Sequence, residues 1–243
     1  MIANDARVLL HLLRGQPRRG SQAERLQAFY APQASRYDAF RERLLHGRRE
    51  LIGRLDALPG AAVVELGAGT GRNLLFFGNR LADLDVQLVD LCPALLEQAR
   101  RRTADMDNVR VVDADVVSWR PERPVDVVYL SYSLTMIPDW QGAIDNAIGM
   151  LKPGGSLGVV DFYVSAAQPA AGLERHGPLA RAFWPRWFAH DGVHLDPAHL
   201  DCLRARLPDH ELLERRAKVP YLAGLSVPYY VFIGRRPAPL SGG

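Results

Sequence analysis

Apolar residues along the chain form short, nearly continuous runs separated by longer segments in which they recur at helical spacing. Five runs rich in Val and Leu have the length of strands, at residues 61–66, 86–90, 109–112, 125–130 and 156–161. Strands buried on both faces of a parallel sheet have this composition. Two further strand-like runs, 211–219 and 227–234, follow a loop-rich stretch of Trp, Phe and His at residues 162–208.

The segments between the first runs are predicted to be helices. Apolar side chains repeat every three or four residues over 72–81, 93–103 and 141–151, and a Lys-Pro-Gly-Gly turn at 152–155 precedes the fifth strand. Strands that alternate with helices predict an α/β fold with a doubly wound, mostly parallel sheet of seven strands.

Three more helical segments are predicted before the first strand, at residues 1–14, 22–31 and 37–58. Gly15 and Pro17 end the first of them, and Pro59 with Gly60 ends the third. We therefore divide the chain into an N-terminal helical extension over 1–58, a core domain over 59–236 and a flexible tail over 237–243.

A glycine-rich loop follows the first strand. Glu65 ends the strand, and Gly67, Gly69 and Gly71 come at alternate positions after it. Because glycine has no side chain, a ligand can lie against the bare backbone of such a loop. The amides of a following helix would point back at that ligand.

Two ligand classes compete for this loop. A dinucleotide needs the spacing G-x-G-x-x-G/A, but here the sixth position is the bulky Arg72. The second predicted strand ends in Asp90, 90 − 71 = 19 residues after the last glycine. A carboxylate at this point can accept both hydroxyls of a ribose. A helix cap is the other interpretation of Asp90.

Composition limits the classes of function. The 243 residues, 48% apolar and 23% charged, are typical of one globular domain with appendages. The net charge of 30 − 27 = +3 and the lack of a basic stripe disfavour nucleic acid as a partner. Two cysteines, Cys92 and Cys202, make no disulfide framework, so a reducing cytoplasm is expected.

Taken in order, Glu65, the three glycines, Asp90, Asp115 and the turn at 152–155 resemble the motifs of the class I S-adenosylmethionine-dependent methyltransferases, over residues 35–235. The resemblance implies a Rossmann-like methyltransferase fold whose last strand runs antiparallel. It implies S-adenosylmethionine as cofactor, S-adenosylhomocysteine as product and no metal. The segment before the glycine loop would act as a lid over the cofactor.

A narrower resemblance is to the diacylglyceryl-homoserine N-methyltransferases of bacterial betaine-lipid synthesis. It implies successive methylation of one lipid amine to diacylglyceryl-N,N,N-trimethylhomoserine. The related phosphatidylethanolamine N-methyltransferases share much of the architecture and remain an alternative, as do enzymes that methylate other small-molecule amines. The resemblance rests on Tyr37-Asp38, Gly47-Arg48, Ser131-Tyr132, residues 136–140, residues 187–191 with His194, residues 219–221 and residues 227–230.

The resemblance also implies site residues. Asp115 would bind the adenine amino group and the amide of Val116 a ring nitrogen, with Asp113 as the alternative acid. Tyr30, Tyr37 and Arg48 are candidates for the methionine end. The complete predicted cofactor set is Tyr37, Arg48, Glu65, Gly67, Gly69, Gly71, Asn73, Asp90, Leu91, Asp115, Val116 and Ser131.

Residues 131–140 follow the fourth strand and are predicted to face the cofactor, because ligands of open parallel sheets lie beyond the carboxyl ends of the strands. With the stretch 184–194, they are predicted to form the acceptor pocket. The amine must lose its proton before each attack, to water or to a nearby base. The predicted catalytic residues are Tyr132, Asp139, His190 and His194, although each can instead cover the core. The His190-to-His194 spacing is a poor match to a zinc motif, because Asp191 stands where Glu is needed and Gly192 weakens a helix.

Three other functions stay open. The fold also suits transfer of the cofactor's 3-amino-3-carboxypropyl group, a non-catalytic cofactor-binding subunit, and nucleic-acid methylation, which the charge disfavours. Residues 1–19 combine an apolar run at 8–13 with flanking arginines, so they either pack on the domain or lie on anionic lipid. The latter predicts a cytoplasmic protein peripheral to the inner membrane face. The resemblance adds an expected association with the enzyme that makes the homoserine lipid.

Overall fold

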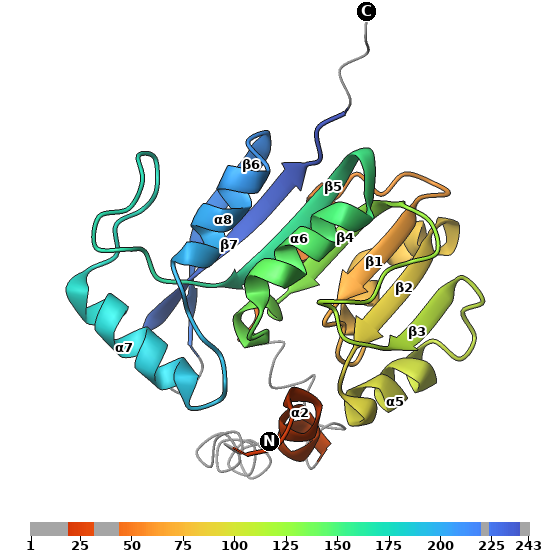
Figure 1. Ribbon diagram of the computed structural model, residues 1–243, viewed down its shortest axis with the longest axis horizontal. Helices are drawn as coiled ribbons and strands as arrows, with labels where there is room; N and C mark the ends of the chain where they lie inside the picture. Colours follow the sequence, from red (N-terminus) through yellow and green to blue (C-terminus); the bar gives the residue numbers. More distant parts are fainter. Residues whose placement is uncertain (1–18, 32–43, 220–223, 239–243) are drawn as a thin grey trace, which may run out of the picture.

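The computed structural model describes residues 19–31, 44–219 and 224–238. Seven strands form one sheet in the order β3-β2-β1-β4-β5-β7-β6 (Figure 1). β7 runs antiparallel to both β5 and β6, whereas β1 to β5 are parallel. This is the expected doubly wound sheet with an antiparallel strand near its end. The strands are Ala62–Leu66, Asp85–Asp90, Val109–Asp113, Val125–Ser131, Leu151–Phe162, His210–Lys218 and Ser226–Arg235.

Both faces of the sheet are buried, which is why the strands read as continuous apolar runs. Neighbouring residues such as Val63 and Val64 belong to different hydrophobic clusters, one on each face. Helices α6 (Trp140–Met150) and α8 (Ala198–Arg206) cover one face (Figure 1). Helix α4 (Arg48–Arg54) packs on the other, against β5 and β7.

Two helices lie beside the ends of the parallel strands. α5 (Pro93–Arg102) follows β2 and has the predicted bounds within one residue. α2 (Gln22–Tyr30) begins with a capping box made by Ser21 and Glu24, and it lies beyond the carboxyl ends of the strands (Figure 1). The predicted helix at 1–14 lies outside the described residues.

The single helix predicted over residues 72–81 does not form. Two short 3₁₀ helices, η2 (Arg72–Phe76) and η3 (Gly78–Asp83), occupy this stretch. Gly71 and Gly78 have φ of +66° and +58°, values that interrupt a right-handed helix. No extended helix therefore starts at the glycine loop.

The predicted helix over 37–58 is also shorter than expected within its described part. α4 starts only after Gly47, whose φ is +79°, and it ends at Arg54 because Leu55 is extended. The Lys-Pro-Gly-Gly segment belongs to the long strand β5, where the register with β4 shifts between Val125 and Val127.

The stretch 162–208 contains two helices that the sequence interpretation took as loop, α7 (Pro178–Ala189) and α8. Pro178 stands at the start of α7, where proline suits a helix, but Pro185 lies inside it and hides the helical pattern. Cys92 and Cys202 are free and buried. No helix in the described ranges is both long and apolar enough to cross a membrane.

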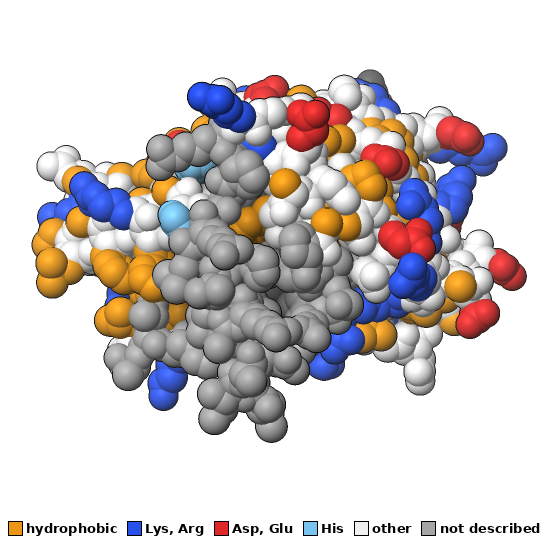
Figure 2. All heavy atoms as spheres, turned by 90° about the horizontal axis from the view of Figure 1, so that it is seen from below, with side chains coloured by type: hydrophobic (Ala, Val, Ile, Leu, Met, Phe, Trp, Pro, Cys, Tyr) orange, Lys and Arg blue, Asp and Glu red, His pale blue; other side chains and the backbone are white. Residues whose placement is uncertain are grey.

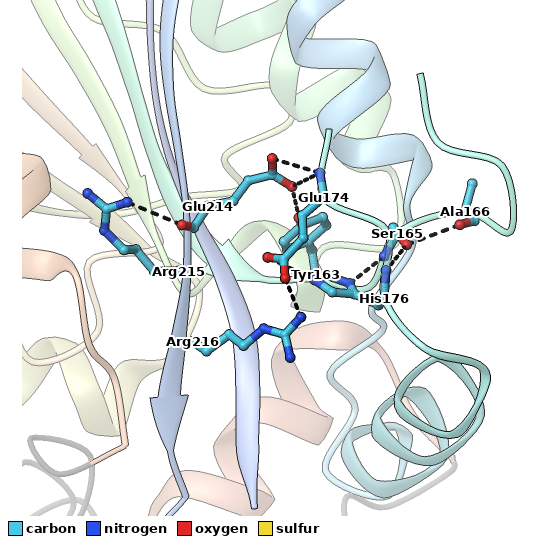
Figure 3. A network of polar contacts seen from close by, with 8 residues as sticks. All are labelled: Tyr163, Ser165, Ala166, Glu174, His176, Glu214, Arg215 and Arg216. Atoms are coloured by element: carbon cyan, nitrogen blue, oxygen red, sulfur yellow. Dashed lines mark hydrogen bonds and ion pairs between the residues drawn. The ribbon is translucent and has the colours of Figure 1, made fainter. Parts of the chain in front are cut away.

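A polar network fixes the segment between β5 and α7 (Figure 3). The carboxylate of Glu214 on β6 accepts hydrogen bonds from the Tyr163 hydroxyl and from the Glu174 amide. Ser165 and His176 are joined twice: the Ser165 amide donates to His176 Nδ1 and the His176 amide donates to Ser165 Oγ, both at 2.9 Å. Strand β6 thereby holds the chain that leads into α7.

Candidate active site

The three loop glycines all have positive φ, but their surroundings differ. A Cβ atom on Gly67 would lie 2.4 Å from Ser133 Cβ, and one on Gly71 would lie 2.8 Å from Leu88 Cδ1. A Cβ on Gly69 would meet only Leu95 Cδ1, at 3.8 Å. Gly67 and Gly71 therefore allow close packing inside the protein, while Gly69 presents bare backbone to open space.

Asp90 at the end of β2 is held beside this loop. Its Oδ2 accepts the Gly69 amide and its Oδ1 accepts the Cys92 amide, each at 2.8 Å. The carboxylate is largely buried, yet it lines a surface pocket. Backbone donors thus orient both oxygens of an acid that faces the pocket.

Glu65 lies beneath the pocket. It is completely buried and accepts hydrogen bonds from Asn73 Nδ2 at 2.6 Å and from the Tyr129 hydroxyl at 2.8 Å. Burial raises the pKa of its carboxyl to about 7, although both hydrogen bonds act in the opposite direction. Glu65 was predicted to bind the cofactor, but Asn73 separates it from the pocket.

Arg48 connects α4 to this group. Its Nη1 donates to Asn73 Oδ1 at 3.3 Å, and its Nε donates to the Leu45 carbonyl at 3.1 Å. Arg48 and Asn73 both line the pocket. The Arg48 guanidinium and the Asn73 amide therefore both line the pocket, and Glu65 positions them through its hydrogen bond with Asn73.

Helix α2 closes the other side of the pocket. Gln22 Nε2 donates to the Met136 carbonyl at 3.2 Å, and Gln27 Oε1 accepts the Ala94 amide at 3.0 Å. Tyr30 lines the pocket, and its hydroxyl lies 3.3 Å from Met136 Sδ. The described part of the N-terminal extension thus covers the carboxyl edge of the sheet. The predicted residue Tyr37 lies outside the described residues.

The predicted Ser131 and Tyr132 both line the pocket. The Ser131 hydroxyl is buried and has no hydrogen-bond partner among the described residues. Tyr132 has a φ of +54°, unusual for a bulky residue and typical of functional sites. Its hydroxyl donates to the His46 carbonyl at 2.6 Å. Burial raises the pKa of Tyr132 well above its ordinary value, so its hydroxyl stays protonated and is unsuited to act as a base.

The other three residues predicted to be catalytic do not line this pocket. Asp139 is exposed and caps α6 through the Gly142 amide, at 3.0 Å. His190, at the end of α7, and His194 are exposed, and the His194 amide donates to the Thr135 carbonyl at 2.7 Å. The backbone of His194 thus contacts the stretch 131–140, but the side chains of Asp139, His190 and His194 do not line the pocket, and their catalytic role stays a prediction.

Leu91 and Val116 line the pocket as predicted, whereas Asp115 does not. Asp115 is exposed, and its Oδ1 accepts the Val117 amide at 2.9 Å, which is the turn-capping alternative. Its role toward adenine stays a prediction. Pattern reasoning missed several lining residues, because apolar periodicity predicts a helix but not what its faces contact. These are Gln22, Leu26, Leu45, Ala68, Thr70, Arg72 and Leu95, whereas Ser133, Met136 and Ile137 belong to the predicted stretch 131–140.

Asp161 supports the loop after β4 from inside. This fully buried carboxylate accepts the Thr135 amide at 3.1 Å, the Thr135 hydroxyl at 2.8 Å and its neighbour Phe162's amide at 2.8 Å. Burial raises its pKa to about 7. Asp161 therefore positions the pocket wall without reaching the pocket. In the described part of the chain, no group of three or more His, Cys, Asp or Glu is placed to hold a metal ion.

Comparisons with known proteins agree with this geometry. Residues 63–155 match the family model of a methyltransferase domain. The chain is 30% identical over 167 residues to a trans-aconitate 2-methyltransferase of Methylobacterium radiotolerans, a match that covers 67% of this chain and 63% of that protein. The chain thus spans less than two thirds of that curated relative.

Solved structures show the fold. Phosphoethanolamine N-methyltransferase 2 of Haemonchus contortus, in complex with phosphomonomethylethanolamine and S-adenosylhomocysteine, has a TM-score of 0.70 at 15% identity over 91% of this chain and 61% of its own. The N-methyltransferase NodS of Bradyrhizobium japonicum, in complex with S-adenosylhomocysteine, has a TM-score of 0.63 at 17% identity over 87% and 98%. The fold is therefore the Rossmann-like methyltransferase fold.

Proposed function

We propose that the chain, which carries a methyltransferase domain over residues 63–155, transfers methyl groups from S-adenosylmethionine to the amine of a lipid. The observation that carries the proposal is the open backbone at Gly69, with the Asp90 carboxylate fixed next to it. Both sit at the carboxyl edge of the sheet, where open α/β sheets bind ligands.

The pocket suits S-adenosylmethionine. Asp90 provides an acceptor for ribose hydroxyls, and Gly69 leaves room beside it. The buried Ser131 hydroxyl, unpaired among the described residues, is a polar group that a ligand can satisfy. Arg48 and Asn73 can hold a carboxylate at the other end. When bound, this cofactor supplies a sulfonium methyl group that a nucleophile can take.

The protein's own contribution is orientation and exclusion of water. Helix α2, Met136 and Ile137 wall the pocket with apolar side chains, and holding an acceptor in one geometry lowers the barrier to transfer. Tyr132 stays protonated and bonded to His46, so it shapes the pocket and holds no proton-accepting role. The amine then loses its proton to water before each transfer.

Two lines support a lipid amine as acceptor. The motifs around Ser131-Tyr132 and residues 136–140 resemble those of the diacylglyceryl-homoserine N-methyltransferases, and these residues include pocket-lining side chains. Two structural neighbours bear the name of N-methyltransferase. The proposed product is diacylglyceryl-N,N,N-trimethylhomoserine, with phosphatidylethanolamine as the alternative lipid amine.

A second candidate is methylation of a carboxylate. The curated relative is a trans-aconitate 2-methyltransferase, and Arg48 and Arg72 line the pocket. Guanidinium groups bind carboxylates well. However, the Arg48 guanidinium already donates to Leu45 and Asn73, and apolar side chains form much of the wall.

One incubation separates these candidates. The protein receives methyl-labelled S-adenosylmethionine and, in parallel reactions, diacylglyceryl-homoserine, phosphatidylethanolamine or trans-aconitate. We expect label in the homoserine lipid, with mass gains of up to three methyl groups. Base-labile label in trans-aconitate would overturn the lipid proposal, and cofactor binding without any turnover would favour a non-catalytic subunit.

A further inference from the structure

Helix α7 exposes a row of large apolar side chains. Leu179, Phe183 and Trp187 lie four residues apart, on one side of the helix, with exposed fractions of 84%, 40% and 43%. The Phe183 and Trp187 rings stack with centroids 5.7 Å apart. We call these three residues the outer face of α7.

Helix α7 is anchored to the core through its opposite side. The inner side of α7 is formed by Trp184 and Phe188, which are 3% and 4% exposed and belong to the core. Phe188 stacks on Phe162 at 4.7 Å, which anchors the helix. Leu179, Phe183 and Trp187 can therefore contact another surface while Trp184 and Phe188 keep the helix on the core.

The charged side chains of α7 itself are all basic. Arg186 is exposed on the same side, and its Nη1 donates to the Ala182 carbonyl at 2.7 Å, so its guanidinium lies along the helix. α7 contains no acidic residue, and exposed Arg175 precedes it. Glu174, the acid before that arginine, is engaged by Arg216 of β6. The face is thus apolar and cationic.

We propose that the outer face of α7 binds the surface of an anionic lipid bilayer. Trp and Phe settle at the boundary between headgroups and acyl chains, while arginines contact the phosphates. Anionic headgroups complement the cationic flank. A second copy of this chain fits less well, because a two-fold contact would bring together two helices whose charged side chains are all basic.

This surface lies on the side of the pocket. α7 and α2 both lie toward the carboxyl edge of the sheet (Figure 1), and Figure 2, seen from that side, shows hydrophobic side chains gathered at the left, where α7 lies. Phe162 packs on both Phe188 and the pocket residue Tyr132, with ring centroids 4.7 and 4.6 Å apart. Docking would bring the pocket near the membrane. Membrane docking of α7 rests on the lipid acceptor proposed above, but vesicle binding can be measured without any methyl transfer.

Vesicle binding of the full chain tests the proposal. Phosphatidylcholine vesicles with and without phosphatidylglycerol are sedimented with the protein. We expect binding to the anionic vesicles to fall about tenfold or more in the double variant Phe183→Ala/Trp187→Ala. Leu58→Ala is the matched control, because Leu58 is 69% exposed and outside α7. Equal binding by parent and double variant would overturn the proposal.

A conservative variant keeps the test independent of folding. Brominated lipids quench tryptophans that reach the acyl chains, so quenching should drop in Trp187→Phe, which keeps an aromatic ring in place. Unchanged quenching in Trp187→Phe would show that α7 stays out of the bilayer. A dimer in solution that dissociates in Phe183→Ala would assign the face to a second copy instead. Absence of lipid methylation with intact quenching would overturn the proposed function alone.

Discussion

Three acidic side chains near the carboxyl edge of the sheet hold three different positions. Asp90 faces the pocket and is oriented by two backbone amides. Glu65 and Asp161 are completely buried, and each organises neighbours that form the pocket wall. The same functional group therefore faces the pocket in one position and supports its surroundings in the other two.

Replacing Asp90 by Asn should weaken cofactor binding. The change removes the charge from an acceptor of ribose hydroxyls, and charge-assisted hydrogen bonds contribute about 1.5–3 kcal/mol, so affinity should fall about ten- to a hundredfold. Calorimetry with S-adenosylhomocysteine measures this directly. Asp85→Asn is the matched control, because Asp85 begins the same strand but is exposed and does not line the pocket. Equal losses in both variants would reject the ribose role.

Glu65 should make the protein less stable as pH rises. Its pKa is raised from 4.5 to about 7, so between these values the folded chain keeps a proton that the unfolded chain has released. Stability from this group is thus complete below about pH 4.5 and declines up to about pH 7. Glu65→Gln should reduce the slope of unfolding free energy against pH by up to about 1.4 kcal/mol per unit.

Urea denaturation across this pH window measures the slope. Asp161 has a pKa raised from 3.8 to about 7 and keeps its own dependence in the variant, so a residual slope remains. Glu97→Gln, on the exposed side of α5, is the control and should leave the slope unchanged. A Glu65→Gln protein with the full parental slope would contradict the assignment.

Several residues that line the pocket could be predicted one by one, because they follow the ends of successive strands in chain order. Gly67 and Asp90 could be placed from the ends of the first two predicted strands, whereas Val116 came from the family resemblance. The predicted catalytic residues Asp139 and His190 could not, since they lie in loops and helix ends whose direction depends on tertiary packing. Ser131 came from the same reasoning about strand ends as Asp90.

Within the glycine loop, Gly67 and Gly71 are packed against other side chains, whereas Gly69 faces open space beside the pocket. Gly69→Ala places a methyl group in open space, so it should lower stability by only about 1–2 kcal/mol of backbone strain. Its effect on S-adenosylhomocysteine affinity should be larger, because the methyl group would occupy the ligand's place. Gly67→Ala adds a clash with Ser133 and should destabilise the protein more.

Gly60→Ala is the control that measures the cost of backbone strain without a clash or a ligand contact. Gly60 has a φ of +81° with no atom within 4 Å of an added Cβ, and it does not line the pocket. Thermal melts and binding titrations of the three variants form the comparison. Gly69→Ala with parental affinity would mean that the ligand lies elsewhere.

The apolar pattern predicted strands correctly where Val and Leu dominated a short run. The strands β1, β2 and β4 were predictable from runs of Val and Leu. α7 was missed because Pro185 interrupts it and because its two sides are both aromatic, so no polar face marks the helical period. The stretch after β1 was read as one helix, since pattern alone does not show that Gly78 adopts a positive φ.

At the scale of the whole molecule, contacts between distant segments hold the chain between β5 and α7 against strand β6. Glu214 on β6 should be critical, since it accepts hydrogen bonds from Tyr163 and Glu174 across the chain (Figure 3). Glu214→Ala leaves these donors unpaired and should lower the free energy of unfolding by about 1–3 kcal/mol. It should also speed proteolysis between residues 164 and 177.

The neighbouring Glu211→Ala is the control on the same strand. Glu211 pairs with Arg54 at the surface, and exposed ion pairs contribute about 0–1 kcal/mol. Urea melts and limited proteolysis with mass spectrometry compare the two variants. Equal stability of Glu211→Ala and Glu214→Ala would show that the network does not anchor the segment.

The position of β7 has a consequence for how the protein is made. β7 fills the place between β5 and β6, and Tyr229 on it packs where a Cβ on Gly47 would lie, directly before the helix that carries Arg48. A chain still emerging from the ribosome therefore has an open β5 edge, and Gly47 lacks its contact with Tyr229, until residue 235 has been synthesised. Translation that stops early should yield chains that present a bare strand edge to chaperones and proteases. Only chains that include the last strand should acquire cofactor affinity.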